Sequence, residues 1–186
     1  MKRKYDIIIK NGKVIDPSQK MNSIMDIGIA NGKIIEINDN ISIQDGENII
    51  QAENKYVSPG FIDIHVHVYW GVSPWGIDVD THCINNGVTT VVDAGSAGLE
   101  TMNGFKKYII QKSQTDVKAL LNISSIGLAS PSHIWEVEDI RFVDIKRTVE
   151  KFEEHNDVLV GIKIRIPQKV NRNLDSLNLA LEAGDI

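Results

Sequence analysis

Features that define several classes of protein are scarce in this sequence. Cys83 is the only cysteine among 186 residues, which excludes a disulfide framework within the chain. The N-terminal apolar run is three isoleucines long, too short for the core of a signal peptide or for a membrane span. Both features lead us to expect a cytoplasmic protein with no membrane partner.

Positive charge is also in the minority. The chain has a net charge of -5 and an isoelectric point near 5.5. Surfaces that bind nucleic acids or anionic membranes are rich in Lys and Arg, so neither partner is expected. We therefore expect a small-molecule substrate and, as a macromolecular partner, further copies of the chain.

The first 56 residues predict a small β domain. Apolar residues make up 42% of the chain, enough to bury a sizeable core. The pairs Asn11-Gly12 and Asn31-Gly32 each lie between short apolar runs. Asn-Gly is the strongest short hairpin signal because both residues tolerate positive φ. These patterns predict one small antiparallel sheet with a hairpin at each pair.

From residue 57 onward, apolar runs that predict strands alternate with segments that predict helices. This alternation is typical of βαβ units and a parallel sheet. Four such units are present, whereas a closed (β/α)₈ barrel takes eight units and about 250 residues. We expect an α/β fold: a partial TIM-type barrel (residues 57–186) preceded by a small antiparallel β subdomain (residues 1–56). The predicted strands cover residues 57–68, 88–93, 117–126 and 158–166, and the helices cover 78–86, 99–112, 141–155 and 174–183, with Gly87 and Gly184 as helix stops.

The first predicted barrel strand carries a candidate metal site. In its sequence VSPGFIDIHVHV, the period of two places Asp63, His65 and His67 on one face. Two imidazoles at i and i+2 lie about 6–7 Å apart and can reach one cation. The alternative is that these histidines lie on a solvated sheet face. Against it, the other face is an apolar row, as expected of an inner strand covered by helices: Ile62, Ile64, Val66 and Val68.

The fourth predicted barrel strand contributes a lysine. In VGIKIRI, isoleucines alternate with Lys163 and Arg165. If the isoleucines pack on helices, Lys163 points to the side that holds His65 and His67. A neutral lysine can take up carbon dioxide to form a carbamate, an oxygen ligand that can bridge two metal ions. A solvated lysine, or an ion pair with Asp63 or Asp93, remains the alternative. Arg165, on the same face, is a candidate for binding substrate.

Other polar and aromatic residues have two interpretations each. His133 follows the third predicted strand and is either a substrate contact or a plain loop residue. Asp93 closes the second strand and either orients a metal site or caps the following loop. Trp70 and Trp75 either line the mouth of a pocket or pack in the structure. His82 and His155 are expected at the surface or at helix caps.

Three segments together resemble a known family. VSPGFIDIHVHVYWG, GVTTVVDAGSAG and VGIKIR are similar to the N-terminal half of the amidohydrolase superfamily, specifically its dihydroorotase-like deacetylase branch. That family combines a β-sandwich built from both chain ends, the urease-like composite domain, with a (β/α)₈ barrel. The resemblance extends over nearly the whole chain.

The resemblance implies roles for individual residues. His65 and His67 would bind the more buried metal, usually zinc, and carboxylated Lys163 would bridge two metals. Family members use a metal-activated hydroxide to cleave an amide, cyclic amide or acyl ester of a small molecule. The family's remaining ligands, histidines of the fifth and sixth strands and a general-base Asp of the eighth, are not among these 186 residues.

Two hypotheses follow for the chain. In the first, it is the N-terminal part of a zinc-dependent amidohydrolase and lacks its C-terminal half. In the second, it is a truncated, catalytically silent fragment that acts at most as a metal-binding or self-associating module. An apolar sheet with open edges is expected to drive self-association, unless two halves pair into a barrel-like homodimer.

Overall fold

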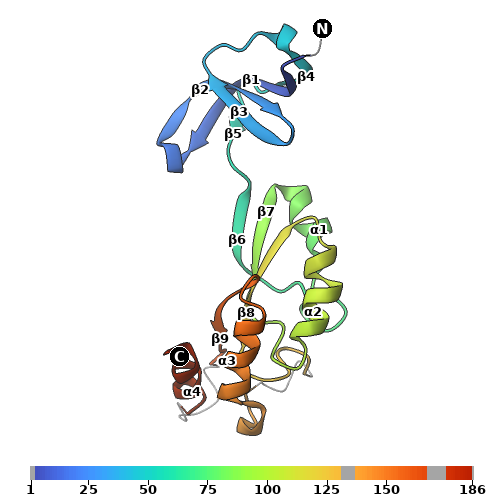
Figure 1. The fold of residues 1–186 in the computed structure, drawn as a ribbon, viewed down its shortest axis with the longest axis vertical. Helices are drawn as coiled ribbons and strands as arrows, with labels where there is room; N and C mark the ends of the chain where they lie inside the picture. Colours follow the sequence, from blue (N-terminus) through green and yellow to red (C-terminus); the bar gives the residue numbers. More distant parts are fainter. Residues whose placement is uncertain (1–2, 131–136, 167–174, 186) are drawn as a thin grey trace. The chain divides into compact units, whose positions relative to one another are not determined.

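The computed structural model describes residues 3–130, 137–166 and 175–185 (Figure 1). The chain divides into two compact units, Met1–Pro59 and Gly60–Ile186. Within the described residues, no helix has both the length and the apolar character needed to cross a membrane.

The first unit is a five-stranded sheet. Strands β1 (Tyr5–Asp16), β2 (Met21–Ala30) and β3 (Lys33–Asn38) are antiparallel neighbours. Strands β4 (Gly46–Gln51) and β5 (Tyr56–Val57) both pair with β1 in parallel. The sheet order is β3-β2-β1-β4, with β5 beside a second part of β1. The sheet is therefore mixed, because two parallel strands join the predicted antiparallel ones.

The hairpin predicted at Asn31-Gly32 is confirmed. These two residues connect β2 to β3, with φ of 52° at Asn31 and 70° at Gly32. Positive φ at both central residues is the requirement of a two-residue type I′ turn.

The hairpin predicted at Asn11-Gly12 is wrong. Strand β1 runs through this pair, and its pairing with β2 shifts register between Ile9 and Gly12. Asn11 has φ of 58°, and its N–H donates to the Asp26 carboxylate at 2.8 Å. A β-bulge uses the same positive φ as a hairpin turn. The chain reverses instead at the short 3₁₀ helix Pro17–Gln19.

The first unit encloses a charged pair as well as an apolar core. Tyr5, Ile8 and Ile41 form the buried apolar cluster. Lys10 forms an ion pair with Asp26, and both side chains are buried. Burial opposes ionisation of Asp26, but Lys10 and two backbone N–H groups outweigh it, so the pKa of Asp26 lies below its usual range.

The second unit is built on a four-stranded parallel sheet. Strands β6 (Phe61–Val66), β7 (Val88–Asp93), β8 (Asp116–Asn122) and β9 (Leu159–Lys163) are neighbours in that order. All three pairings are parallel. The predicted fold class, a partial barrel preceded by a β subdomain, is confirmed.

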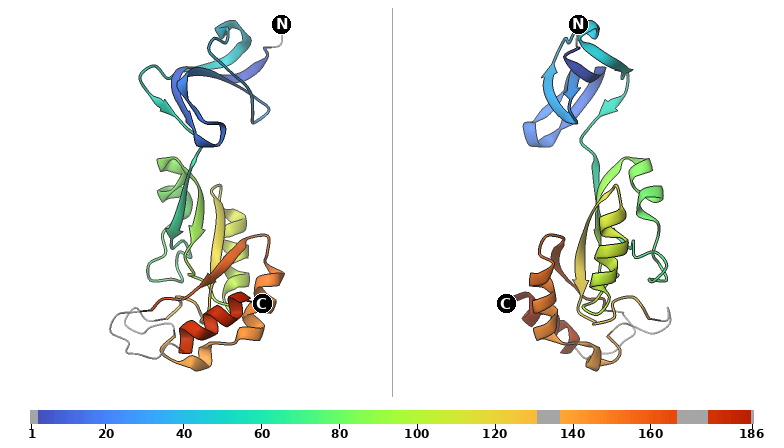
Figure 2. Two further views of the ribbon diagram at one scale, coloured as in Figure 1. Left: turned by 90° about the vertical axis from the view of Figure 1, so that its left-hand side faces the viewer. Right: turned by 45° about the vertical axis from the view of Figure 1, so that its right-hand side comes forward.

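Helices follow the strands as the alternation predicts. They are α1 (Val79–His82), α2 (Met102–Tyr108), α3 (Ile145–Glu154) and α4 (Asp175–Asp185). Figures 1 and 2 show α2 lying beside β7 and β8. Gly184 is not a helix stop, because α4 continues through Gly184 and ends at Asp185. A glycine is tolerated within a helix at a cost of about 1 kcal/mol.

The core of this unit lies between α2 and the sheet. Met102 and Phe105 of α2 are fully buried against strand residues of β7 and β8. Cys83 is buried in the same cluster, as a small apolar residue would be. The other buried strand residues in this cluster are Val91, Val117, Ala119, Leu121 and Leu159.

Strand β6 lies at the edge of the sheet, and its apolar face is only partly covered. Ile62 and Ile64 are 64% and 74% exposed, whereas Val66 packs against the core and Val68 is fully buried. The expectation of a fully covered apolar row is wrong for the first two residues. Among the described strands β6 pairs only with β7, and this pairing shifts register between Asp63 and Val66.

Candidate functional site

The polar residues predicted to form a site come together where the parallel strands end. His65 lies near the end of β6, and His67 follows its last residue. Lys163 is the last residue of β9. Carboxyl ends of parallel strands meet at one edge, and functional groups of β/α folds gather there. The topology therefore places groups nearly 100 residues apart in the chain at the same edge.

His65 and His67 form a close pair. Their ring centroids are 5.7 Å apart in an edge-to-face arrangement. His65 is exposed and His67 is half-buried. Burial, with further electrostatic contributions from His65, Lys163 and Arg165, lowers the pKa of His67 to about 4. His67 is therefore neutral at pH 7, the form in which imidazole binds metals.

Lys163 lies over the backbone of Gly95, and its charge is one of those that lower the pKa of His67. Gly95 has φ of 84°, and a Cβ there would lie 2.6 Å from Lys163 Cγ. The neighbouring Ile162 instead packs into the apolar clusters. The alternation predicted for this strand thus holds. Among the ion pairs of the described residues, none joins Lys163 to Asp63 or Asp93.

Arg165 and Trp75 complete one side of the cluster. The guanidinium carbon of Arg165 lies 4.6 Å from the Trp75 ring centroid, a cation–π contact. The same ring lies 6.0 Å from the His67 ring. The Ile77 N–H donates to the His67 carbonyl at 3.0 Å, which returns the loop to the histidines. Trp75 therefore lies at the edge of the site, in contact with Arg165 and near His67. His133, the other predicted substrate contact, lies outside the described residues.

A buried carboxylate and a buried serine support His67. Asp93 is fully buried, and its two oxygens accept N–H groups of Val68 at 2.7 Å and Ser96 at 2.6 Å. Ser96 is also fully buried, and its Oγ lies 3.0 Å from His67 Nδ1. Burial raises the pKa of Asp93, although these N–H groups oppose it. Asp93 thus caps the loop after β7, and Ser96 is a site residue that the sequence alone did not reveal.

The residues present fit a divalent metal in part. Two imidazoles are suitable nitrogen ligands for zinc, and Lys163 would add an oxygen ligand once carboxylated. Within the described ranges, no three or more His, Cys, Asp or Glu side chains converge on one point. The cluster therefore offers a partial ligand set with positions left for further ligands.

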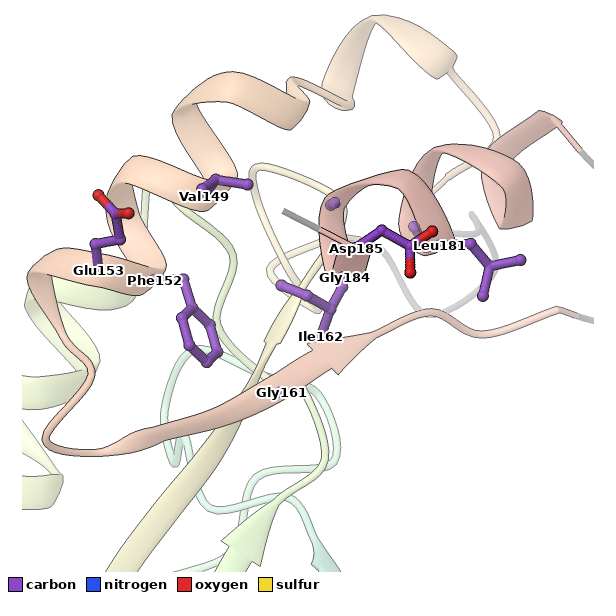
Figure 3. A pocket seen from close by; sticks show the side chains of 10 residues that line it. Val149, Phe152, Glu153, Gly161, Ile162, Leu181, Gly184 and Asp185 are labelled. Carbon is purple, nitrogen blue, oxygen red and sulfur yellow. The ribbon is translucent and has the colours of Figure 1, made fainter.

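A cavity of about 520 Å³ lies elsewhere, between α3, β9 and α4 (Figure 3). Phe152 of α3 points toward β9, and Ile162 and Leu181 line the same space. Lys163, His65 and His67 are not among its lining residues. The cavity is a feature of the helix-covered side of the sheet and is separate from the polar cluster.

The fold and the cluster define a class of protein, one with a partial (β/α) barrel and paired histidines at the end of its first barrel strand. No family profile matches the chain. Its sequence is 37% identical to a deacetylase of Agrobacterium fabrum over 134 residues, 72% of this chain and 33% of that protein. It is 40% identical to a dihydroorotase of Aquifex aeolicus over 113 residues, 59% of this chain and 26% of that protein.

A solved dihydroorotase structure superimposes with a TM-score of 0.86 at 32% identity, covering 96% of this chain and 48% of that chain. The chain belongs to the amidohydrolase superfamily and is dihydroorotase- and deacetylase-like. It spans less than half the length of each of these relatives.

Proposed function

We propose that this chain supplies the metal-binding part of a hydrolase that cleaves an amide, cyclic amide or acyl ester bond in a small molecule. The convergence of His65, His67 and Lys163 at one edge of the parallel sheet is the observation that carries the proposal. The names of the relatives, deacetylase and dihydroorotase, support this reaction class.

In this proposal each residue of the cluster has a defined part. His65 and His67 hold one divalent metal, zinc, through ring nitrogens, and Lys163 as a carbamate provides an oxygen ligand. When bound, the metal supplies Lewis-acid activation of a carbonyl group and of water. The low pKa of His67 keeps its ring neutral at pH 7, so no proton competes with the metal there.

Arg165 is the proposed substrate-binding residue of this part of the site. Its guanidinium lies on Trp75, whose ring also neighbours His67. A guanidinium binds carboxylates through two parallel hydrogen bonds, and stacking on an aromatic ring fixes its plane. We propose that it orients an anionic or strongly polar group of the substrate. His133 remains a prediction, as does a cytoplasmic location.

Elemental analysis of the purified chain tests the metal site. We expect about one or two equivalents of zinc, lost in His65→Ala and reduced in Lys163→Ala. His82→Ala is the matched control, because His82 is an exposed histidine of α1 outside the cluster. A well-folded chain that binds no zinc, or a His65→Ala variant that binds as much as the His82→Ala control, would contradict the proposal.

The exposed edge of the sheet favours a second candidate function, self-association. Phe61, Ile62 and Ile64 of β6 are 62%, 64% and 74% exposed. An exposed apolar edge strand offers its backbone groups and side chains to another chain. Sedimentation velocity tests this function: we expect concentration-dependent association that weakens in Ile64→Lys. A compact monomer at every concentration would rule it out.

A further inference from the structure

Asp93 connects two segments that the site depends on. One carboxylate oxygen accepts the N–H of Val68, the residue after His67, and the other accepts the N–H of Ser96. Both distances, 2.7 and 2.6 Å, are at the short end for N–H···O hydrogen bonds. Asp93 therefore holds the end of β6 and the loop after β7 in a fixed relation.

Ser96 lies between this carboxylate and His67. Its Oγ is 3.0 Å from His67 Nδ1, and its side chain is among the groups that oppose the rise in the pKa of Asp93. Ser96 and Asp93 are both fully buried, so water does not compete for these contacts. A hydroxyl can donate one hydrogen bond while it accepts another, whereas an ionised carboxylate can only accept.

We propose that Ser96 is a positioning residue that fixes the tautomer of His67. Its O–H donates to Asp93, and its oxygen accepts the Nδ1–H of His67. The Nε2 lone pair of His67 is then left for the metal. The inference rests on the proposed function for the role of that metal, but the contact between Ser96 and His67 exists without it. Ligating histidines commonly donate their second ring N–H to a fixed acceptor, which orients the ring.

The chain also offers a matched control. Ser124 is a fully buried serine, and within the described residues its Oγ has no hydrogen-bond partner. Ser124→Ala removes a buried hydroxyl just as Ser96→Ala does, but it leaves His67 untouched. A difference between the two variants therefore reports the contact with His67 and not the loss of a buried hydroxyl in general.

Long-range ¹H–¹⁵N NMR of the metal-free 186-residue chain at pH 7 tests the inference, with His67→Gln identifying the His67 signals. In the unsubstituted chain we expect a protonated Nδ1 and an unprotonated Nε2 on His67. Ser96→Ala should give a mixture of both tautomers, and Ser124→Ala should keep the single tautomer. Zinc titration against a chelator should show affinity about 10–100-fold weaker in Ser96→Ala only.

The measured tautomer of His67 tests the inference independently of zinc binding. A protonated Nε2 in the unsubstituted chain, or an unchanged tautomer in Ser96→Ala, would overturn it. The first of these outcomes does not depend on Ser96→Ala, so the inference can be refuted even if that variant fails to fold. A chain that binds no zinc but keeps the Ser96-dependent tautomer would overturn the proposed function alone.

Discussion

Gly95 provides the sharpest test of how the backbone shapes the candidate site. It has φ of 84°, and a Cβ added there would lie 2.6 Å from Cγ and 2.7 Å from Cβ of Lys163. Gly71, in the loop after β6, has a similar φ of 80° with nothing within 4 Å of an added Cβ. Gly95→Ala and Gly71→Ala therefore impose the same backbone strain, but only Gly95→Ala meets Lys163.

The two variants should differ in stability by a predictable amount. An alanine in the left-handed region lowers the free energy of unfolding by about 1–2 kcal/mol, and this loss is common to both variants. Gly95→Ala adds an overpacking cost of about 1–3 kcal/mol, because the Cβ of Lys163 cannot move without its backbone. We expect Gly95→Ala to unfold at lower urea concentration than Gly71→Ala and to displace Lys163 from its place beside His67.

Urea denaturation and zinc content measure both effects. Gly95→Ala should lose more free energy of unfolding than Gly71→Ala and should retain less zinc. Equal losses of stability in the two variants would show that Lys163 does not lie over Gly95. A destabilised Gly95→Ala variant with full zinc content would show that the position of Lys163 does not matter for metal binding.

Two further predictions concern the interiors of the two units. The folded pKa of Asp26 lies below the unfolded value of about 4, so its stabilising contribution is present above that value and is lost as the pH falls through the folded pKa. Urea denaturation from pH 7 to pH 2 should show this loss, and a pH dependence unchanged in Asp26→Asn would contradict it. Phe105→Ala should cost about 3–5 kcal/mol of unfolding free energy, since Phe105 is fully buried and its ring lies 4.8 Å from Tyr69. Tyr108→Ala on the same helix, at a residue 65% exposed, is the control and should cost far less.

Local patterns were sufficient to predict the sheet of the second unit and the histidine pair. The i and i+2 spacing of His65 and His67 on one strand fixes their proximity whatever the rest of the chain does. The alternation around Lys163 similarly separates its face from that of Ile162, as the structure shows.

Contacts between distant segments could not be predicted in this way. Ser96 contacts His67 across 29 positions, and its sequence context is a small-residue loop with no metal-ligand pattern. Asn11-Gly12 failed as a hairpin signal because positive φ serves a bulge as well as a turn. The parallel pairing of β4 and β5 with β1 depends on a choice of partner that no strand's own sequence encodes.

Strand β6 shows most clearly what a sequence pattern cannot decide. The pattern assigns Ile62, Ile64, Val66 and Val68 to one face, but only the last two are covered. Alternation determines which side a residue points to, whereas burial depends on what lies opposite. The relatives are more than twice as long as the part that this chain matches. Because Ile62 and Ile64 are exposed, a chain that pairs with the β6 edge would bury part of their surface. We therefore expect protection of the β6 amides from hydrogen exchange to rise with protein concentration.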